Sequence, residues 1–221
     1  MINKVSQSVD EAISGIQSGC TVLIGGFGSS GIPNHLIGAV LRNGSRDLTI
    51  VTNNAGSGDS GVAALLKARR VKKIVTSYPR SKGSIWFEEL YRAGEIELEL
   101  VPQGSLSEKV RAGGGGIGAF YTPTGAGTML GEGKEEKMID GVLHILEFAI
   151  KGDVSLISAK FADRWGNLTY HATARNFGPS MAMASTLTIV EVKKIVELGH
   201  LDPEIIITPG IFVDRVVAVE E

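Results

Sequence analysis

The sequence predicts an α/β fold in which a mostly parallel, doubly wound sheet is flanked by helices, with a glycine-rich loop and a hairpin excursion. Short apolar runs typical of buried strands alternate with helix-like segments over the first half of the chain, which indicates βαβ units. Glycine supplies 29 of the 221 residues, nearly twice its usual share of about 7 %. We expect residues 1–221 to form a single domain.

The first unit begins with an amphipathic helix over Val9–Gln17. The apolar run Thr21–Ile24 is typical of a buried parallel strand. A glycine turn, Gly25–Gly31, follows that strand, and Pro33 suits the first position of a helix that ends near Gly44.

The same rhythm then continues. We expect strands over Leu48–Val51, Lys73–Ser77 and Glu97–Val101, separated by helices over Val62–Lys67 and Trp86–Ala93. Because ligands of such sheets lie beyond the carboxyl ends of the strands, the loops that follow these strands are expected to meet at one edge.

The middle of the chain departs from this rhythm. A short helix is expected over Ser105–Arg111, followed by a glycine-rich loop that begins with Gly113–Gly118 and extends beyond Gly125. Residues 134–147 are typical of a hairpin that turns at Asp140-Gly141, a dipeptide suited to a tight turn.

The last third returns to the earlier pattern. Strands are expected over Val154–Lys160, Thr186–Val190 and Val213–Val219, with a loop at Asp163–Asn167 and a helix over Pro179–Ala184.

Composition excludes several classes of protein. The chain carries 22 Lys and Arg against 24 Asp and Glu, so no basic surface would attract nucleic acid or an acidic membrane. A single cysteine, Cys20, excludes an internal disulfide and indicates a reducing compartment. No apolar run approaches the roughly 18 residues that a transmembrane helix requires. We therefore expect a cytoplasmic protein.

The stretch Gly26–Gly31 matches the pattern G-x-G-x-x-G between a strand and a helix, as in dinucleotide-binding proteins. That fingerprint also requires an acidic residue after the second strand, where this chain has Asn53 and Asn54. Three interpretations stay open: an NAD(P)-binding oxidoreductase, glycines that only permit tight packing, and another phosphate-bearing ligand at the turn and the following helix N-terminus.

Neutral amides mark two predicted strand ends, at Asn53, Asn54 and Gln103. Amides donate hydrogen bonds to a carbonyl oxygen or to its developing oxyanion without changing the charge of a site. Ordinary turn chemistry explains asparagine in loops equally well.

The usual catalytic motifs are absent from the sequence, which has no G-x-S-x-G, no P-loop and no H-E-x-x-H. The four histidines are far apart along the chain, so no metal site is expected. Arg80 and Lys82 lie in a basic loop that either binds an anionic substrate or is simply solvated.

Several segments together resemble the family I coenzyme A transferases over essentially the whole chain. They are Val22–Pro33, Leu48–Gly56, Val101–Gly104, Phe120–Gly125, Gly166–Leu168 and Ala174–Phe177. The resemblance is to the A (alpha) subunit of the two-subunit 3-oxoacid CoA-transferases, whose fold resembles that of certain sugar-phosphate isomerases.

The resemblance implies a reaction and a partner. Coenzyme A passes from an acyl-CoA such as succinyl-CoA to a 3-oxo acid through a glutamyl-CoA thioester on the B (beta) subunit, in an α2β2 assembly. The glutamate lies in a Ser-Glu-Asn-Gly context, which this chain lacks. No permanently bound cofactor is implied, because the CoA thioester is a substrate.

The resemblance also implies site residues. Asn53 or Asn54, with Gln103, would position the acyl carbonyl. The CoA-contacting loop would comprise Gly25, Gly26, Phe27, Gly28, Ser29, Ser30 and Gly31.

Three segments, Ser77–Ser81, Trp86–Gly94 and Asp163–Asn167, resemble 3-oxoadipate CoA-transferases more than those that use acetoacetate. The stretch Ser81–Ser84 departs from that subgroup because it is more basic. Arg80 or Lys82 would then bind the second carboxylate of the acceptor. Acetoacetate remains an alternative acceptor, and an oxidoreductase or a sugar-phosphate-binding isomerase or regulator remains an alternative class.

Overall fold

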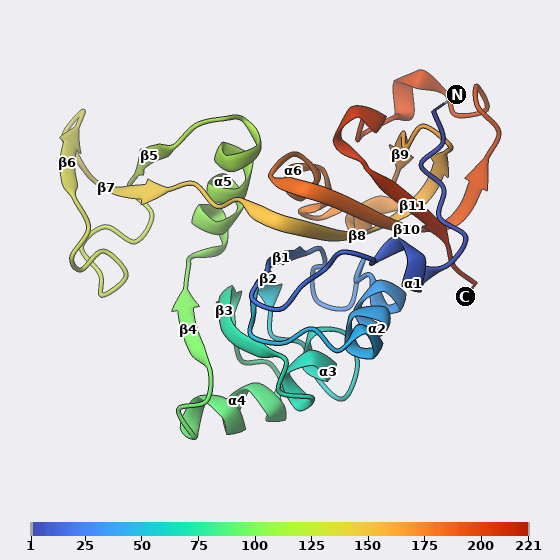
Figure 1. The fold of residues 1–221 in the computed structure, drawn as a ribbon. Helices are drawn as coiled ribbons and strands as arrows, with labels where there is room; N and C mark the ends of the chain where they lie inside the picture. The colour runs from blue at the N-terminus through green and yellow to red at the C-terminus, as the bar shows by residue number, and fades with distance from the viewer. Residues whose placement is uncertain (1, 221) are drawn as a thin grey trace.

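The computed structural model describes residues 2–220 and contains a large, mostly parallel sheet and a small antiparallel one (Figure 1). The strands of the large sheet lie in the order β11-β10-β8-β1-β2-β3-β4, and a short strand, β9, pairs with β8 in the antiparallel sense. Their bounds are β1 Thr21–Ile24, β2 Leu48–Asn54, β3 Val71–Tyr78, β4 Glu97–Leu100, β8 Gly152–Asp163, β9 Leu168–Thr169, β10 Ser185–Val196 and β11 Arg215–Ala218.

The order of the strands confirms the doubly wound topology. From β1 the chain adds β2, β3 and β4 on one side, and later β8, β10 and β11 on the other. Val22 of β1 consequently lies opposite Ile50 of β2 and Val154 of β8, with all three strands parallel. The direction of winding changes between β1 and β8, and ligands of such sheets bind near this point.

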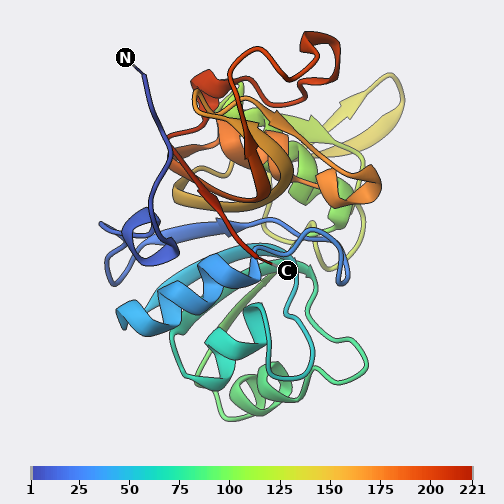
Figure 2. The ribbon, with the colours of Figure 1, turned by 90° about the vertical axis from the view of Figure 1, so that its right-hand side faces the viewer.

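Helices cover both faces of the large sheet. One face is covered by α1 (Val9–Ala12), α2 (Asn34–Asn43), α3 (Val62–Lys67) and α4 (Ile85–Arg92), and the other by α5 (Gln103–Gly114) and α6 (Gly178–Met183). In Figure 2 the blue and cyan helices α2 and α3 lie along their side of the sheet.

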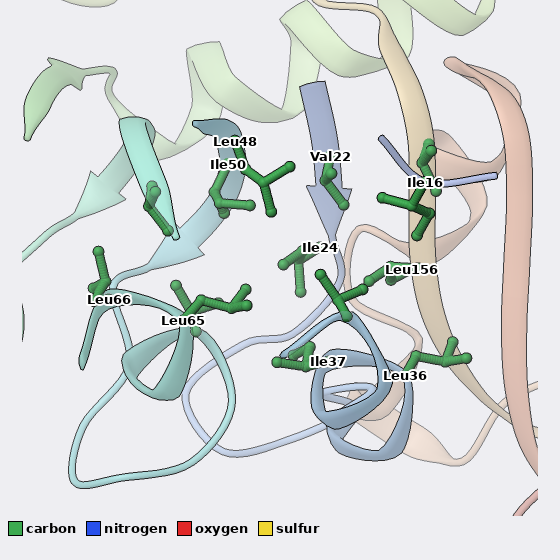
Figure 3. Close-up of a cluster of buried hydrophobic side chains, with 14 of the residues drawn as sticks. Ile16, Val22, Ile24, Leu36, Ile37, Leu48, Ile50, Leu65, Leu66 and Leu156 are labelled. Carbon is green, nitrogen blue, oxygen red and sulfur yellow. The ribbon is translucent and has the colours of Figure 1, made fainter. Parts of the chain in front are cut away.

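The alternation of side chains along each strand divides the core into two clusters. Ile24 packs with Leu36, Ile37 and Leu65 on the side of α2 and α3 (Figure 3). Leu23, its neighbour in sequence, belongs instead to the cluster formed with α5 and α6.

The small sheet has the order β5-β7-β6 and projects at one end of the molecule (Figure 1). Its strands are β5 (Ala119–Thr122), β6 (Glu136–Ile139) and β7 (Val142–Phe148). The predicted hairpin is confirmed: its turn residues Asp140 and Gly141 have φ angles of 48° and 76°, the positive values that a type I′ turn requires.

The assignment of residues 113–125 to a loop was wrong in two places. Gly113 and Gly114 continue α5. A Cβ on Gly113 would lie 2.0 Å from the Ile150 carbonyl oxygen, and one on Gly114 would lie 2.6 Å from Met183 Cβ. Close packing thus requires glycine there, and overrides its low helix propensity. Residues 119–122 form β5 because they pair with β7.

The first helix is also shorter than predicted, since α1 ends at Ala12 and Gly15 adopts a φ of 94°. Three 3-10 turns lie within residues 2–220: η1 (Ala172–Arg175), η2 (Pro203–Ile205) and η3 (Gly210–Phe212). The N-terminal segment lies against β11, where Ser6 N donates to Val216 O at 2.8 Å (Figure 2). Over the same described range, no helix is long and apolar enough to cross a bilayer.

Candidate functional site

A cavity of about 710 Å³ lies at the carboxyl edge of the large sheet, where the loops after β1, β2 and β3 meet the start of α5. The convergence expected from the sequence is therefore present. Its wall consists of Gly25, Gly26, Phe27, Gly28, Ser29, Ile32, Thr52, Asn53, Asn54, Gly56, Ser57, Ser60, Gly61, Val62, Ser77, Tyr78, Ser81, Lys82 and Gln103.

A hydrogen-bonded cluster of polar side chains occupies this wall. Asn53, near the end of β2, is 5 % exposed. Its Oδ1 accepts hydrogen bonds from Gln103 Nε2 at 2.7 Å and from Ser77 Oγ at 2.9 Å. With Oδ1 engaged twice, the Nδ2 group of Asn53 is left without a partner among the described residues and can donate to a ligand.

Asn54 differs from Asn53. Successive residues of a strand point to opposite faces, and Asn54 Oδ1 accepts from Gly56 N at 2.9 Å, as in an Asx turn. Asn54 thus fits the interpretation as an ordinary turn residue. Asn53 and Gln103 instead form the hydrogen-bonded cluster. All three line the cavity, and their catalytic roles stay predictions.

The glycines of the loop after β1 fall into two groups. A Cβ on Gly26 would lie 2.9 Å from Ile32 Cγ1, and one on Gly31 only 2.4 Å from Ala174 O. Close packing within the chain therefore explains these two glycines. Gly28 has a φ of 60°, and no described atom lies within 4 Å of the position that a Cβ would take, so it faces open space at the tip of the loop.

The tip is a tight turn. Phe27 N donates to Ser30 O and Ser30 N donates to Phe27 O, each at 3.0 Å. Phe27 is 50 % exposed beside the cavity. The turn therefore presents backbone and an aromatic side chain to any ligand that occupies the cavity.

The N-terminus of α2 is already occupied by a carboxylate of the same chain. Glu191 on β10 is buried, and its Oε2 accepts from Leu36 N at 3.0 Å. Burial raises the pKa of Glu191 to about 7, although hydrogen bonds from the backbone of Leu36, His35 and Asn34 act in the opposite direction. Glu191 therefore already uses the backbone donors at the start of α2 that the phosphate interpretation would need.

The two cations expected to bind substrate are placed differently. Lys82 is exposed and lies on the cavity wall. Arg80 lies off that wall, with its Nε on Glu88 Oε1 at 3.1 Å. The described wall residues include no Asp or Glu, and no group of three or more potential metal ligands gathers within residues 2–220.

Sequence reasoning missed three contacts of this region. Ser77 Oγ donates to Asn53 Oδ1, Glu191 Oε2 accepts from Leu36 N, and Asn176 Oδ1 accepts from Gly26 N at 2.9 Å. One signal was available for Glu191, since a lone acidic residue in the apolar run Thr188–Val192 is unusual in a buried strand. Nothing in the sequence pairs Asn176 with Gly26.

The fold and cavity together define a doubly wound α/β protein whose described cavity wall carries neutral amide side chains and no carboxylate. Residues 6–219 match the family model described as Coenzyme A transferase. The chain belongs to this family, and within it to the A (alpha) type of subunit. The dinucleotide-dependent oxidoreductase interpretation has no support from these comparisons.

Two relatives illustrate the similarity. The chain is 58 % identical over 219 residues to the A subunit of the 3-oxoadipate CoA-transferase of Pseudomonas putida, covering 99 % of this chain and 95 % of the relative. It is 47 % identical over 215 residues to the A subunit of the succinyl-CoA:3-ketoacid coenzyme A transferase of Helicobacter pylori, covering 97 % and 92 %.

Solved structures confirm the fold class. An acyl-CoA transferase from Escherichia coli O157:H7 superposes with a TM-score of 0.86 at 21 % identity and 99 % coverage of this chain, which spans 47 % of that longer chain. Glutaconate coenzyme A-transferase from Acidaminococcus fermentans superposes with a TM-score of 0.85 at 22 % identity, covering 98 % of this chain and 76 % of the other.

Proposed function

We propose that this chain is the alpha subunit of an enzyme that transfers CoA from succinyl-CoA to a 3-oxo acid, with 3-oxoadipate as the acceptor. The relatives from Pseudomonas putida and Acinetobacter baylyi, 58 % and 54 % identical, are both named as the A subunit of a 3-oxoadipate CoA-transferase. Each alignment covers at least 95 % of the relative.

The observation that carries the proposal is the hydrogen bond from Gln103 Nε2 to Asn53 Oδ1. It fixes the Asn53 amide with Nδ2 free to donate at the cavity wall. Attack on a thioester places negative charge on the carbonyl oxygen, and a fixed donor aimed at that oxygen lowers the barrier by several kcal/mol.

The attacking carboxylate comes from the beta subunit in this proposal. No Asp or Glu belongs to the described cavity wall, so a glutamate of the beta subunit completes the site. In the first half-reaction this glutamate takes CoA from the acyl-CoA as a thioester and the free acid leaves. In the second, the acceptor acid takes CoA and regenerates the carboxylate. An α2β2 assembly accommodates such shared sites.

Two features of the cavity suit the substrates. The loop tip at Phe27 and Gly28 gives the CoA thioester a close approach to backbone. Lys82, which forms no ion pair within residues 2–220, provides a cation for a carboxylate or phosphate. Arg80 is a weaker candidate because Glu88 already neutralises it.

Acetoacetate is the second candidate acceptor. Relatives named as A subunits of succinyl-CoA:3-ketoacid coenzyme A transferases, one of them marked probable, are 46–49 % identical to this chain. Acetoacetate has one carboxylate where 3-oxoadipate has two, so a cation at Lys82 discriminates between them.

A coupled assay of the chain mixed with its beta subunit tests the proposal, with 3-oxoadipate and acetoacetate measured side by side. We expect no turnover by the isolated chain, turnover on mixing, and a higher kcat/KM for 3-oxoadipate. Light scattering of the mixture gives the stoichiometry. Robust turnover by the isolated chain would contradict the shared site. A higher kcat/KM for acetoacetate would make acetoacetate, and not 3-oxoadipate, the acceptor.

A further inference from the structure

Asn176 joins the C-terminal part of the chain to the glycine loop after β1. Its Oδ1 accepts from Gly26 N at 2.9 Å across 150 residues of sequence, and also from Phe177 N at 2.6 Å. Its Nδ2 donates to Ala174 O at 2.7 Å. Both ends of the amide are therefore used, which fixes its orientation.

The glycine loop is shaped to receive this side chain. A Cβ on Gly31 would lie 2.5 Å from Asn176 Nδ2, and one on Gly25 would lie 3.5 Å from Asn176 Oδ1. Glycine at position 31 is thus required by the approach of residues 174–176, quite apart from any ligand.

The backbone of Asn176 is itself strained. Its φ of 34° and ψ of −126° lie in a region that glycine favours and that other residues rarely adopt. Strain of this kind persists where the surrounding contacts hold the residue in place, and it gathers at functional sites. An asparagine at a position that glycine would fit better indicates that the side chain has a role.

The rest of the loop has few anchors. At its base, Gly25 N donates to Leu156 O at 3.0 Å. The backbone hydrogen bonds of the exposed tip join Phe27 to Ser30, so they lie within the turn itself. The bond to Asn176 consequently decides how the tip is directed over the cavity.

We propose that Asn176 is a positioning residue that holds the Gly25–Gly31 loop in the orientation that receives the CoA thioester. The identity of the ligand rests on the proposed function above, whereas the anchoring of the loop does not. Asn176 lies outside the cavity wall and acts through Gly26.

Three variants separate positioning from stability. Asn176→Ala removes the acceptor and leaves the backbone strain. Asn176→Gly removes the acceptor but relieves the strain, so it loosens the loop without the same loss of stability. Asn176→Asp keeps an oxygen for Gly26 N and loses the donor to Ala174.

Asn167→Ala is the matched control. Asn167 joins another pair of loops by accepting from Gly210 N at 2.8 Å and donating to Asp163 Oδ2 at 2.8 Å. Like Asn176, it is half-buried. It does not line the cavity.

Hydrogen exchange of the full chain, followed by mass spectrometry, tests the anchor. We expect amides of residues 26–31 to exchange about tenfold faster in Asn176→Ala and Asn176→Gly, with Asn176→Asp closer to wild type. Asn167→Ala is expected to change exchange near Gly210 only. Unchanged exchange of residues 26–31 in both Ala and Gly variants would overturn the anchor.

Kinetics of the assembled enzyme test the positioning. The KM for the acyl-CoA is expected to rise about tenfold in Asn176→Gly with a smaller change in kcat, and to stay unchanged in Asn167→Ala. Faster exchange with an unchanged KM would reduce Asn176 to a structural contact. Failure of the wild-type assembly to use any acyl-CoA would instead refute the proposed function, and exchange alone would then support or overturn the anchor.

Discussion

Gln103 Nε2 lies 2.7 Å from Asn53 Oδ1, although the two residues are 50 positions apart in sequence. Gln103 is the first residue of α5 and Asn53 lies near the end of β2, and the chain between them forms β3 and β4. The bond therefore requires β2, β3 and β4 to be in place, so that the start of α5 lies beside the end of β2. The polar cluster at this cavity consequently depends on the correct assembly of the first half of the chain.

Substitution of Gln103 tests whether this bond matters in the transition state. Gln103→Ala is expected to lower kcat about 10²-fold in the assembled enzyme and to raise KM less, because the released Asn53 amide no longer stays aimed at the oxyanion. Steady-state kinetics measure both constants. Glu108→Gln on the same helix, which disturbs only the ion pair with Arg111, is the control. A pure KM effect would contradict the assigned role.

Within the Gly25–Gly31 loop, Gly28 is the glycine that has no described atom within 4 Å of an added Cβ. Gly28→Val is expected to block binding or turnover of acyl-CoA while the fold persists, because the branched side chain projects from the loop tip and its φ of 60° is unfavourable for valine. Circular dichroism and acyl-CoA titration of the assembled enzyme measure the two effects.

Gly199→Val is the matched control for Gly28→Val. Gly199 also has a positive φ, 88°, with no described atom within 4 Å of the added Cβ, but it does not line the cavity. It carries the same kind of strain and should leave acyl-CoA kinetics unchanged. Equal loss of activity in both variants would mean that general destabilisation, not the loop tip, was responsible.

Elements set by local patterns were predicted from the sequence with good bounds. The strand Thr21–Ile24 and the helix Val62–Lys67 were found as expected, because each is a short apolar segment flanked by glycines or turn residues. In contrast, β5 pairs with β7, from which a loop and β6 separate it in sequence. Helix α5 continues through Gly113, which packs against the backbone of Ile150. Such long-range packing leaves no periodic signal in the sequence.

The candidate site shows the same division. The position of Asn53 and Gln103 at one edge follows from the rule that parallel strands end together, so both could be placed from the sequence. Asn176 accepts from Gly26 in the loop after β1, which lies 150 positions earlier in the sequence. Glu191 accepts from Leu36 in α2, which lies 155 positions earlier. Their partners are backbone amides, which nearly every residue has, and no side-chain pattern identifies them.

A buried ion cluster attaches the small sheet to α5. Glu147 on β7 is 2 % exposed, and its two oxygens lie 2.9 Å from Lys109 Nζ and 2.5 Å from Lys134 Nζ. Burial raises the pKa of Glu147, but the hydrogen bonds from Lys134 and Lys109 outweigh it, so the pKa lies below its usual value. Its stabilising effect is therefore present above the unfolded-state pKa and is lost as the pH falls through the folded-state pKa.

Removal of one cation from this cluster should be costly. Lys109→Met is expected to lower the free energy of unfolding by about 3 kcal/mol, because a buried carboxylate keeps only Lys134 as a partner. The double variant Lys109→Met with Glu147→Leu should recover most of the loss, since no buried charge remains. Urea denaturation at pH 7 measures both. Equal stability of the single variant and wild type would show that solvent reaches Glu147.

Glu191 should make the stability of the chain depend on pH in the opposite direction. Because burial raises its pKa from 4.5 to about 7, ionisation costs more in the folded chain than in the unfolded one. The free energy of unfolding should therefore be highest below about pH 4.5 as far as this group is concerned. The free energy of unfolding should fall by about 3 kcal/mol in total as the pH rises through the folded-state pKa, and it should level off above that pKa.

Glu191→Gln isolates this effect, because the amide oxygen still accepts from Leu36 N while no charge can form. Urea denaturation of both proteins between about pH 4.5 and about pH 8.5 gives the difference in unfolding free energy across the range in which this group titrates. We expect that difference to grow in favour of the variant as the pH rises. The control is Glu11→Gln, which changes an exposed carboxylate of α1. If the difference in unfolding free energy between the variant and wild type stays constant across this range, Glu191 has the same charge in the folded and unfolded states. The backbone amides at the N-terminus of α2 would then fully stabilise its carboxylate.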